Sequence, residues 1–229
     1  SYYVGQTWGE IWGYHTDGLF RSNEEAQEWA AQVDQKYVND RIYSRNGELR
    51  GLRGGDLKYL DLNDNGKIDI GKNTVDDPGD RRIIGNTQPR YMYGLNLNLG
   101  WQGIDFSIFF QGVGKVSWMP SYNCIYFWNT YSYHRPTFIP KNFEEKCWSD
   151  EEGADNSNVL FPRRRGRMCG SSLQTSDYFM QDASYIRLKN LTVGYTLPLK
   201  TKAVEKVRVY FSGENLWYWS PMKEWTDVV

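Results

Sequence analysis

Two runs of alternating residues, separated by a short turn, constrain the fold of this chain most strongly. In the run Tyr91–Trp101 every odd-numbered residue is aromatic or leucine, whereas the even-numbered positions hold methionine, glycine and asparagine. In the run 104–111, isoleucine and phenylalanine at the even positions oppose Asp105 and Ser107. Successive side chains of a strand point to opposite faces, so both runs predict strands with one apolar face. Gln102-Gly103 between them fits a two-residue hairpin turn.

Two later segments show the same alternation. In 186–197 the apolar parity changes near Lys189-Asn190, which predicts a β-bulge or a change of face. In the other segment, Val207, Val209 and Phe211 alternate with polar residues and Tyr210. Strands of about ten residues suit a barrel that crosses a bilayer, and they also suit a long soluble sheet. Alternation alone therefore leaves both architectures open.

Composition and local signals add one helix and exclude some partners. Ser22 and Glu25 form a capping box, and Ala26, Trp29 and Val33 follow at helical spacing, which predicts a short amphipathic helix. The net charge of -1 gives no support for a nucleic-acid partner. Aromatic residues make up 16% of the chain, which suits an aromatic-rich sandwich, a sugar-stacking surface or an interfacial aromatic belt.

The run 61–69 has the spacing of a calcium loop. Its candidate ligands are the side chains of Asp61, Asn63, Asn65 and Asp69 and the carbonyl oxygen of Lys67. Oxygen ligands at alternate positions around Gly66 are what a hard cation requires. The twelfth position, where an EF-hand has Glu, is Lys72, so we expect weak Ca²⁺ binding unless Asp76, Asp77 or Asp80 folds back. The alternative is an Asx-rich turn without metal, held by side-chain to backbone hydrogen bonds.

Other chemistry-bearing residues do not form a recognisable catalytic set. His15 and His134 have no evident nucleophile or carboxylate partner in the sequence, and we expect the chain not to be an enzyme. Cys124, Cys147 and Cys169 lack the spacing of a zinc site. In an oxidising compartment Cys147 and Cys169 are the pair considered for a disulfide.

Several segments together resemble a known family. They are DLNDNGKID, DDPGDRRIIGN, PRYMYGLNLNLGWQGIDFSIFFQGVG, DASYIRLKNLTVGYTLP and VRVYFSGENLW, preceded by GEIWGYHTDGLF. In this order they resemble the carboxyl-terminal part of SusC/RagA-type TonB-linked outer-membrane proteins. The resemblance implies a mainly β fold, with antiparallel strands forming part of a large transmembrane β-barrel of about 22 strands, long loops and a short helix.

The resemblance also implies a function and partners. Family members import oligosaccharides or peptides across the outer membrane of Gram-negative bacteria, with a SusD-like lipoprotein as an extracellular lid and TonB as the source of energy. On this basis residues 1–229 are expected to be a carboxyl-terminal fragment without the plug domain and the terminal strand. Residues 1–90 would be loop-rich and contain the calcium-type loop, and residues 91–229 would hold the barrel strands and a long extracellular loop. Trp118, Trp128, Tyr131 and Tyr133 are candidate contacts for solute or lid.

Two other classes of protein stay open from the residues alone. A soluble, calcium-containing carbohydrate-binding β module would use tryptophan and tyrosine as stacking platforms. A glycan-active enzyme is a third class, although no pair of carboxylates indicates one. Lipid exposure of the apolar strand faces would favour the importer, and glycan binding by a detergent-free monomer would favour the soluble module.

Overall fold

The computed structural model describes residues 5–35, 38, 51–119, 144–163, 174–199 and 204–222. The chain divides into two compact units. Unit 1 comprises Ser1–Gly85 with Met119–Met180, and unit 2 comprises Asn86–Trp118 with Gln181–Asp227. Within the described ranges, no helix has both the length and the apolarity needed to span a membrane. The sequence-based division at residue 90 stays a prediction.

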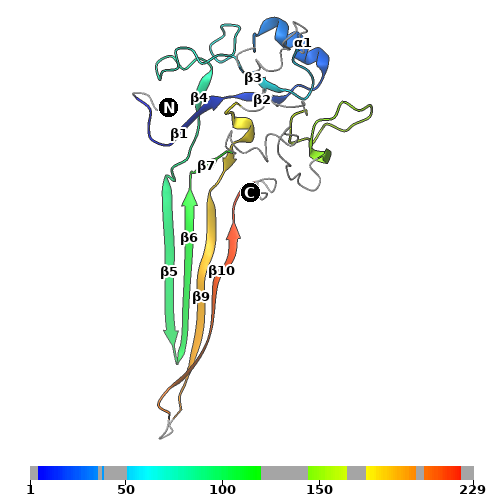
Figure 1. Ribbon diagram of the computed structural model, residues 1–229. Helices are drawn as coiled ribbons and strands as arrows, with labels where there is room; N and C mark the ends of the chain where they lie inside the picture. Colours follow the sequence, from blue (N-terminus) through cyan, green and yellow to red (C-terminus); the bar gives the residue numbers. More distant parts are fainter. Residues whose placement is uncertain are drawn as a thin grey trace, which may run out of the picture. The chain divides into compact units, whose positions relative to one another are not determined.

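Unit 2 is a long antiparallel sheet of four strands, in the spatial order β10-β9-β6-β5 (Figure 1). The strands are β5 (Tyr91–Trp101), β6 (Ile104–Gly114), β9 (Tyr185–Leu197) and β10 (Val207–Trp219). Gln102 and Gly103 join β5 to β6 with φ of +46° and +87°, as a type I′ hairpin turn requires. A separate two-stranded ribbon pairs β7 (Ser117–Trp118) with β8 (Gln181–Asp182). The predicted hairpin and the mainly β, antiparallel architecture are confirmed.

The register of the sheet contains the predicted bulge. Phe109 of β6 pairs with Asn190 of β9, but Phe110 pairs with Leu188, so Lys189 is an extra residue on β9. The pairing of β9 with β10 is irregular at the same level. The extra residue restores the parity that the sequence loses near Lys189, and apolar residues on both sides of the bulge therefore share one face.

Unit 1 contains two short sheets around a small core. β1 (Glu10–Tyr14) pairs with β4 (Arg81–Asn86), and β2 (Thr16–Leu19) pairs with β3 (Leu57–Tyr59). Two single 3-10 turns, η2 (Glu144–Lys146) and η4 (Asp177–Phe179), complete the described elements of this unit. The fully buried side chains include Phe20, Leu57, Tyr59, Ile68 and Phe179.

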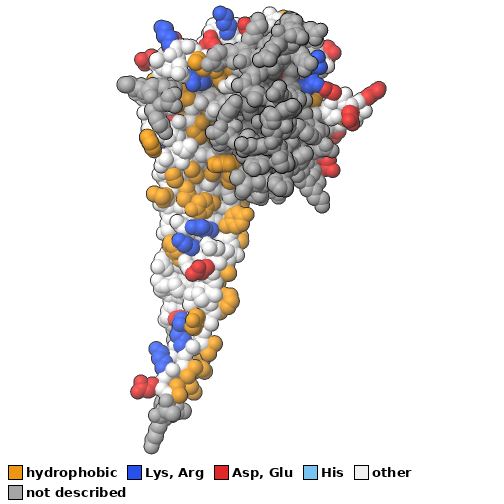
Figure 2. Space-filling model, viewed as in Figure 1, with side chains coloured by type: hydrophobic (Ala, Val, Ile, Leu, Met, Phe, Trp, Pro, Cys, Tyr) orange, Lys and Arg blue, Asp and Glu red, His pale blue; other side chains and the backbone are white. Residues whose placement is uncertain are grey.

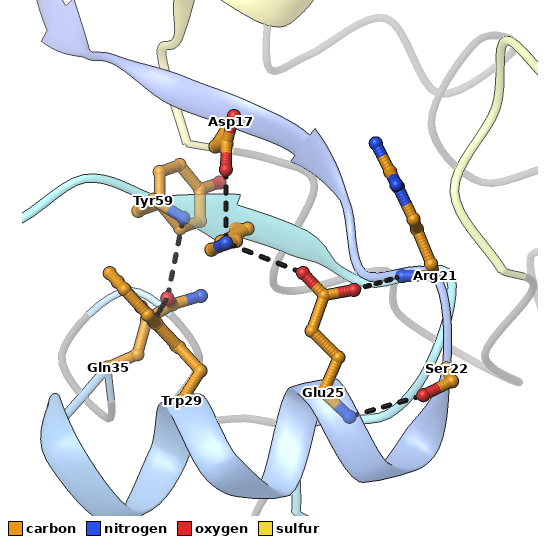
Figure 3. Close-up of polar contacts among 8 residues, drawn as sticks. Asp17, Arg21, Ser22, Glu25, Trp29, Gln35 and Tyr59 are labelled. Atoms are coloured by element: carbon orange, nitrogen blue, oxygen red, sulfur yellow. Dashed lines mark hydrogen bonds and ion pairs between the residues drawn. The ribbon is translucent and has the colours of Figure 1, made fainter.

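Helix α1 (Asn23–Gln32) begins as the capping box predicts. The Ser22 Oγ atom accepts a hydrogen bond from the Glu25 backbone N–H at 3.2 Å. The Glu25 carboxylate reaches back and accepts from the backbone N–H of Arg21 at 2.7 Å, one residue before the cap (Figure 3). The first contact satisfies a donor that the first turn of a helix leaves free, and the second ties the residue before the cap to the helix. The predicted helix and its amino-terminal cap are confirmed.

Helix α1 is held against the paired strands β2 and β3 by polar contacts around Lys58. The Lys58 Nζ atom lies 3.0 Å from Asp17 and 3.4 Å from Glu25, and 5.1 Å from the centre of the Trp29 ring. Trp29 donates its indole N–H to the Gln35 side-chain oxygen (Figure 3). The Gln35 amide in turn donates to the carbonyl of Leu57. Ala26 packs with Phe20 and Leu52 beneath the helix. Lys58 and its polar partners therefore support the position of the helix.

Candidate functional site

One face of the four-stranded sheet carries an apolar side chain at nearly every position. The register places on this apolar face Tyr91, Tyr93, Leu95, Leu97, Leu99 and Trp101 from β5; Ile104, Phe106, Ile108 and Phe110 from β6; Ile186, Leu188, Leu191, Val193 and Tyr195 from β9; and Val207, Val209, Phe211, Trp217 and Trp219 from β10. Leu95, Leu97 and Leu99 are 62%, 44% and 56% exposed. Soluble monomers rarely expose an apolar patch above a few hundred Å². This face therefore requires an apolar phase or a covering layer.

Tyrosine and tryptophan gather toward the two ends of the apolar face. Tyr91, Tyr93 and Trp219 lie toward one end, and Trp101 and Tyr195 lie toward the other. Leucine, isoleucine, valine and phenylalanine fill most of the rows between them. The ten residue steps from Tyr91 to Trp101 span about 34 Å along the strand, or about 26 Å along the membrane normal at a tilt of ~40°. That distance matches the apolar band of about 25 Å and its two aromatic girdles in membrane barrels.

The opposite face, here called the polar face, is mainly polar, although it also carries Met92, Phe109, Tyr210 and Tyr218. Some of its polar side chains are linked across strands. The cross-strand contacts include Arg187 to Gln111 at 2.8 Å and Thr192 to Ser212 at 3.1 Å. Asn96 and Asn98 on β5 also bond to each other at 3.2 Å. Figure 2 shows one side of these strands, on which charged and other polar side chains are interspersed with hydrophobic ones. The sequence-predicted assignment of apolar and polar faces for β5 and β6 agrees with this register.

An ion pair on the polar face joins β10 to β6 and passes over Gly194 of the intervening strand β9. The Arg208 guanidinium of β10 donates to both carboxylate oxygens of Asp105 on β6, with the Nε to Oδ1 distance at 2.9 Å. Gly194 of β9 lies between the two strands, directly opposite Asp105. A Cβ atom at Gly194 would lie 2.6 Å from the Arg208 guanidinium and from both Asp105 oxygens. The missing side chain thus makes the room that the ion pair occupies.

The Asx-rich loop of unit 1 turns its side-chain oxygens onto its own backbone. Asp61 accepts hydrogen bonds from the backbone N–H groups of Asn63, Asn65 and Gly66, the last at 2.7 Å. Asn65 accepts from the N–H of Lys67 at 2.8 Å. These are the side-chain to backbone bonds of an Asx turn. Carboxylate and amide oxygens have further lone pairs, and oxygen atoms of these kinds are the ligands that Ca²⁺ prefers.

Asp80 closes this loop from eleven residues beyond Asp69. Its two carboxylate oxygens accept from the backbone N–H groups of Leu62 and Asp69 at 2.9 and 2.8 Å. Burial raises the pKa of Asp80, and the neighbouring carboxylates of Asp61 and Asp69 add to that increase, while the two backbone donors oppose it. The sequence singled out Asp80 only as a residue that could fold back, and the structure shows that it does.

The described residues contain no group of three His, Cys, Asp or Glu side chains arranged to hold a metal ion. Three of the five predicted ligands, the side-chain oxygens of Asn63 and Asn65 and the carbonyl oxygen of Lys67, are not of these types. Calcium binding by Asp61, Asn63, Asn65, Lys67 and Asp69 therefore stays a prediction.

Of the four aromatic residues predicted to contact solute or lid, Trp118 is described. It is partly buried in β7, where it pairs with Gln181. Trp128, Tyr131 and Tyr133 lie outside the described residues, as do His134, Cys124 and Cys169. Cys147 is buried, and its pairing with Cys169 stays a prediction.

His15 has a carboxylate partner that the sequence did not reveal. Its Nδ1 atom lies 2.7 Å from Asp177, and the backbone N–H and hydroxyl of Thr16 also donate to that carboxylate. The expectation that His15 lacks such a partner was wrong, because the two residues are 162 positions apart. The Thr16 hydroxyl donates to Asp177 and not to the imidazole, so the group does not have the geometry of a nucleophile activated by histidine. It fastens η4 to the β1–β2 corner.

Comparison with curated proteins identifies two related receptors, whereas no family model matches the chain. "TonB-dependent receptor P3" of Formosa agariphila is 30% identical over 168 residues, which are 71% of this chain and 14% of that receptor. "TonB-dependent receptor P26" of the same organism is 27% identical over 184 residues, 77% of this chain and 17% of that receptor. The chain thus spans less than a fifth of the length of either relative.

A solved structure has a similar fold. The structure described as "Structure of the RagAB peptide transporter" aligns with 92% of this chain and 19% of its own, at 18% identity and a TM-score of 0.53. At this identity the similarity concerns the fold alone.

Proposed function

We propose, on the premise that this chain is related to the carboxyl-terminal part of SusC/RagA-type TonB-linked receptors, that its four-stranded sheet is a section of barrel wall in an outer-membrane transporter. The observation that carries the proposal is the sorting of side chains on the apolar face. Leu97 and its neighbours in the middle rows would contact lipid tails, and the Tyr and Trp residues at the two ends would lie at the membrane interfaces. The polar face, with Asn98 and Ser107, would line the lumen.

The connections between strands orient the sheet in this proposal. At one end, β5 joins β6 through Gln102 and Gly103, and β9 joins β10 through 198–206. At the other end, the connection from β6 to β9 runs through 115–184. Barrels of the outer membrane have short periplasmic turns and longer extracellular loops. The turn Gln102–Gly103 would therefore face the periplasm, and the segment with Trp118 would be extracellular.

The whole receptor would act as a transporter and not as an enzyme. It would reside in the outer membrane of a Gram-negative bacterium and import oligosaccharides or peptides, with energy from TonB reaching it through other parts of the receptor. A SusD-like lipoprotein would cover its extracellular side, where Trp118, Trp128, Tyr131 and Tyr133 are candidate contacts. The similar structure is named as a peptide transporter, and peptides are one of these two solute classes.

Calcium would have a structural role in this proposal. The return of Asp80 to the loop supports it, because its carboxylate fixes the backbone at Leu62 and at Asp69, near the two ends of the candidate ligand run. Ca²⁺ bound by Asp61, Asn63, Asn65, Asp69 and the Lys67 carbonyl would stiffen the loop of unit 1 and take no part in transport chemistry.

Cysteine labelling of the full-length receptor in liposomes tests the assignment of the two faces. Leu97→Cys and Asn98→Cys are adjacent on β5 but lie on opposite faces. We expect a lipid-soluble maleimide to label Leu97→Cys and a charged, water-soluble maleimide to label Asn98→Cys. The receptor with only its native cysteines gives the background. The reverse pattern, or labelling of both positions only from water, would contradict the barrel-wall proposal.

A further inference from the structure

A lysine at the end of the β5–β6 hairpin departs from the alternation of its strand. Lys115 follows β6 directly, and continued alternation would place its side chain on the polar face with Val113. Its φ of +51° lies in the left-handed region, which is unfavourable for a residue with a side chain. The Lys115 Nζ atom lies 5.9 Å from the centre of the ring of Tyr91, a residue of the apolar face. The ammonium group is therefore at the border of the apolar face.

A second cation lies at the same level of the hairpin. The Arg90 backbone N–H donates to the Lys115 carbonyl at 3.3 Å, so the two residues are neighbours where β5 begins and β6 ends (Figure 1). Both side chains are exposed, and Tyr91 beside them is 54% exposed. The acidic residue nearest to Lys115 in the register of the described strands is Asp182 on β8, whose carboxylate accepts the backbone N–H of Ser184 at 2.9 Å. Two positive charges and one carboxylate thus lie near this end of the hairpin.

Other cations of unit 2 contact rings on the polar face. The Arg187 guanidinium lies 5.5 Å from the centre of the Tyr185 ring, and the Arg208 guanidinium lies 4.9 Å from the centre of the Tyr210 ring. All four of these side chains belong to the polar face by register. Lys115 differs from both arginines, because its charge lies beside the last aromatic residue of a row of leucines. This position suits a ligand that has a charged group joined to an apolar body.

We propose that Lys115 and Arg90 bind the phosphate group of an anionic membrane lipid whose acyl chains lie along the apolar face. The inference rests on the proposed function, which places this end of the sheet at the extracellular interface. The outer leaflet of an outer membrane is rich in phosphorylated glycolipids. A cation beside an interfacial aromatic ring lies at the depth of the headgroups, and each basic residue there adds to the attraction of anionic lipid. Tyr91 would contact the first methylene groups of the chains.

Three probes separate the phosphate from the acyl chains. Dimyristoylphosphatidic acid and dimyristoylglycerol have the same chains and differ in the phosphate, whereas glycerol 3-phosphate has the phosphate without the chains. Their binding to the full-length receptor in detergent is measured by native mass spectrometry. We expect the receptor to bind the phosphatidic acid at least fivefold more tightly than the diacylglycerol, and we expect an equal concentration of glycerol 3-phosphate not to displace it.

Substitutions at the two ends of the sheet locate the site. Lys115→Gln should weaken phosphatidic acid binding about fivefold and leave diacylglycerol binding unchanged. Lys115→Arg keeps the charge and should retain the affinity. Arg90→Gln should also weaken phosphatidic acid binding. Lys206→Gln, the matched control, removes an exposed positive charge just before β10, at the opposite end of the sheet, and should have no effect. The gel mobility of the folded barrel and the retained binding of diacylglycerol show that a variant has folded.

Three results would overturn the inference. They are unchanged phosphatidic acid binding in Lys115→Gln, an equal loss in Lys115→Gln and Lys206→Gln, and displacement of the lipid by an equal concentration of glycerol 3-phosphate, which would indicate a site for soluble anions. Labelling of Leu97→Cys only from water would instead refute the barrel-wall proposal. Failure of the lipid site alone leaves the labelling of Leu97→Cys from lipid intact, so the two failures are distinguishable.

Discussion

Substitution of arginine along β5 gives the sharpest test of the membrane assignment. Leu97 is one residue from the middle of the strand Tyr91–Trp101, which places it about 3 Å from the midplane at a tilt of ~40°. A lipid-facing arginine at the midplane costs about 2–4 kcal/mol of folding free energy. Tyr91 lies five residues from the middle, about 13 Å from the midplane along the normal, where the cost falls to about 0–1 kcal/mol. Asn98 is two residues from the middle, about 5 Å from the midplane along the normal, but it faces the polar side, where water can hydrate the new charge.

The assay is reversible folding of the full-length receptor into phospholipid vesicles, followed by urea titration and by the gel mobility of the folded barrel. We expect Leu97→Arg to be the least stable variant, with Tyr91→Arg and Asn98→Arg both within about 1 kcal/mol of the unmodified protein. The comparison of Leu97→Arg with Asn98→Arg changes the face of the strand and shifts the depth by only about 3 Å. Equal stability of these two variants would refute the strand-face assignment, and equal stability of Leu97→Arg and Tyr91→Arg would refute the assigned depth.

Three further predictions concern single features of the chain. Gly194→Ala should lower the unfolding temperature by displacing the Arg208–Asp105 ion pair, and the effect should shrink in an Arg208→Gln background; an equal effect in both backgrounds would remove the ion pair as its cause. Isothermal titration should detect weak Ca²⁺ binding that Asp61→Ala abolishes, whereas equal heats, or none, would favour the plain Asx turn. Burial raises the pKa of Tyr178 to about 12, so stability should be unaffected below about pH 10 and should fall between about pH 10 and pH 12 as the unfolded state ionises first. Tyr178→Phe should flatten that decline in a pH series of urea unfolding curves, and an unchanged decline would contradict the assignment.

Local patterns in the sequence predicted the elements whose structure depends on local chemistry. Alternation from Tyr91 to Trp101 predicts β5 because the period of side chains in a strand is fixed at two. The positive φ values of Gln102 and Gly103 follow from the two-residue hairpin, and the loss of parity at Lys189 predicts the bulge. Helix α1 follows from Ser22 and its box, although the Glu25 carboxylate bonds to the N–H of Arg21 rather than that of Ser22.

Contacts between distant segments were beyond the reach of the sequence. β2 and β3 have only four and three residues, so neither carries enough alternation to reveal its partner. The His15–Asp177 contact depends on η4 reaching the β1–β2 corner from 162 residues away. Asp80 was one of three acidic residues that could have returned to the loop. Gly79 and Gly71, both with positive φ, set the backbone path that selects it, since a Cβ at Gly79 would lie 2.4 Å from the Gly71 nitrogen.

The lengths of the described strands limit what they can cover on the apolar face. A soluble sandwich would bury this face against a second sheet of comparable extent about 10 Å away. All strands of eleven residues or more in the described ranges already belong to the one sheet, and the remaining strands there have two to six residues. These short strands cannot cover rows that extend over the whole of β5. Burial against a second protein layer would not favour tyrosine and tryptophan at the two ends of the face over its middle, because packing in a core depends on side-chain volume and shape. A bilayer does sort them, since a tyrosine hydroxyl or an indole N–H is stable at the interface and not among lipid tails. The position of Trp101 and Trp219 at opposite ends of a face filled by leucine, isoleucine, valine and phenylalanine therefore favours lipid over a protein partner as the phase that the sheet contacts.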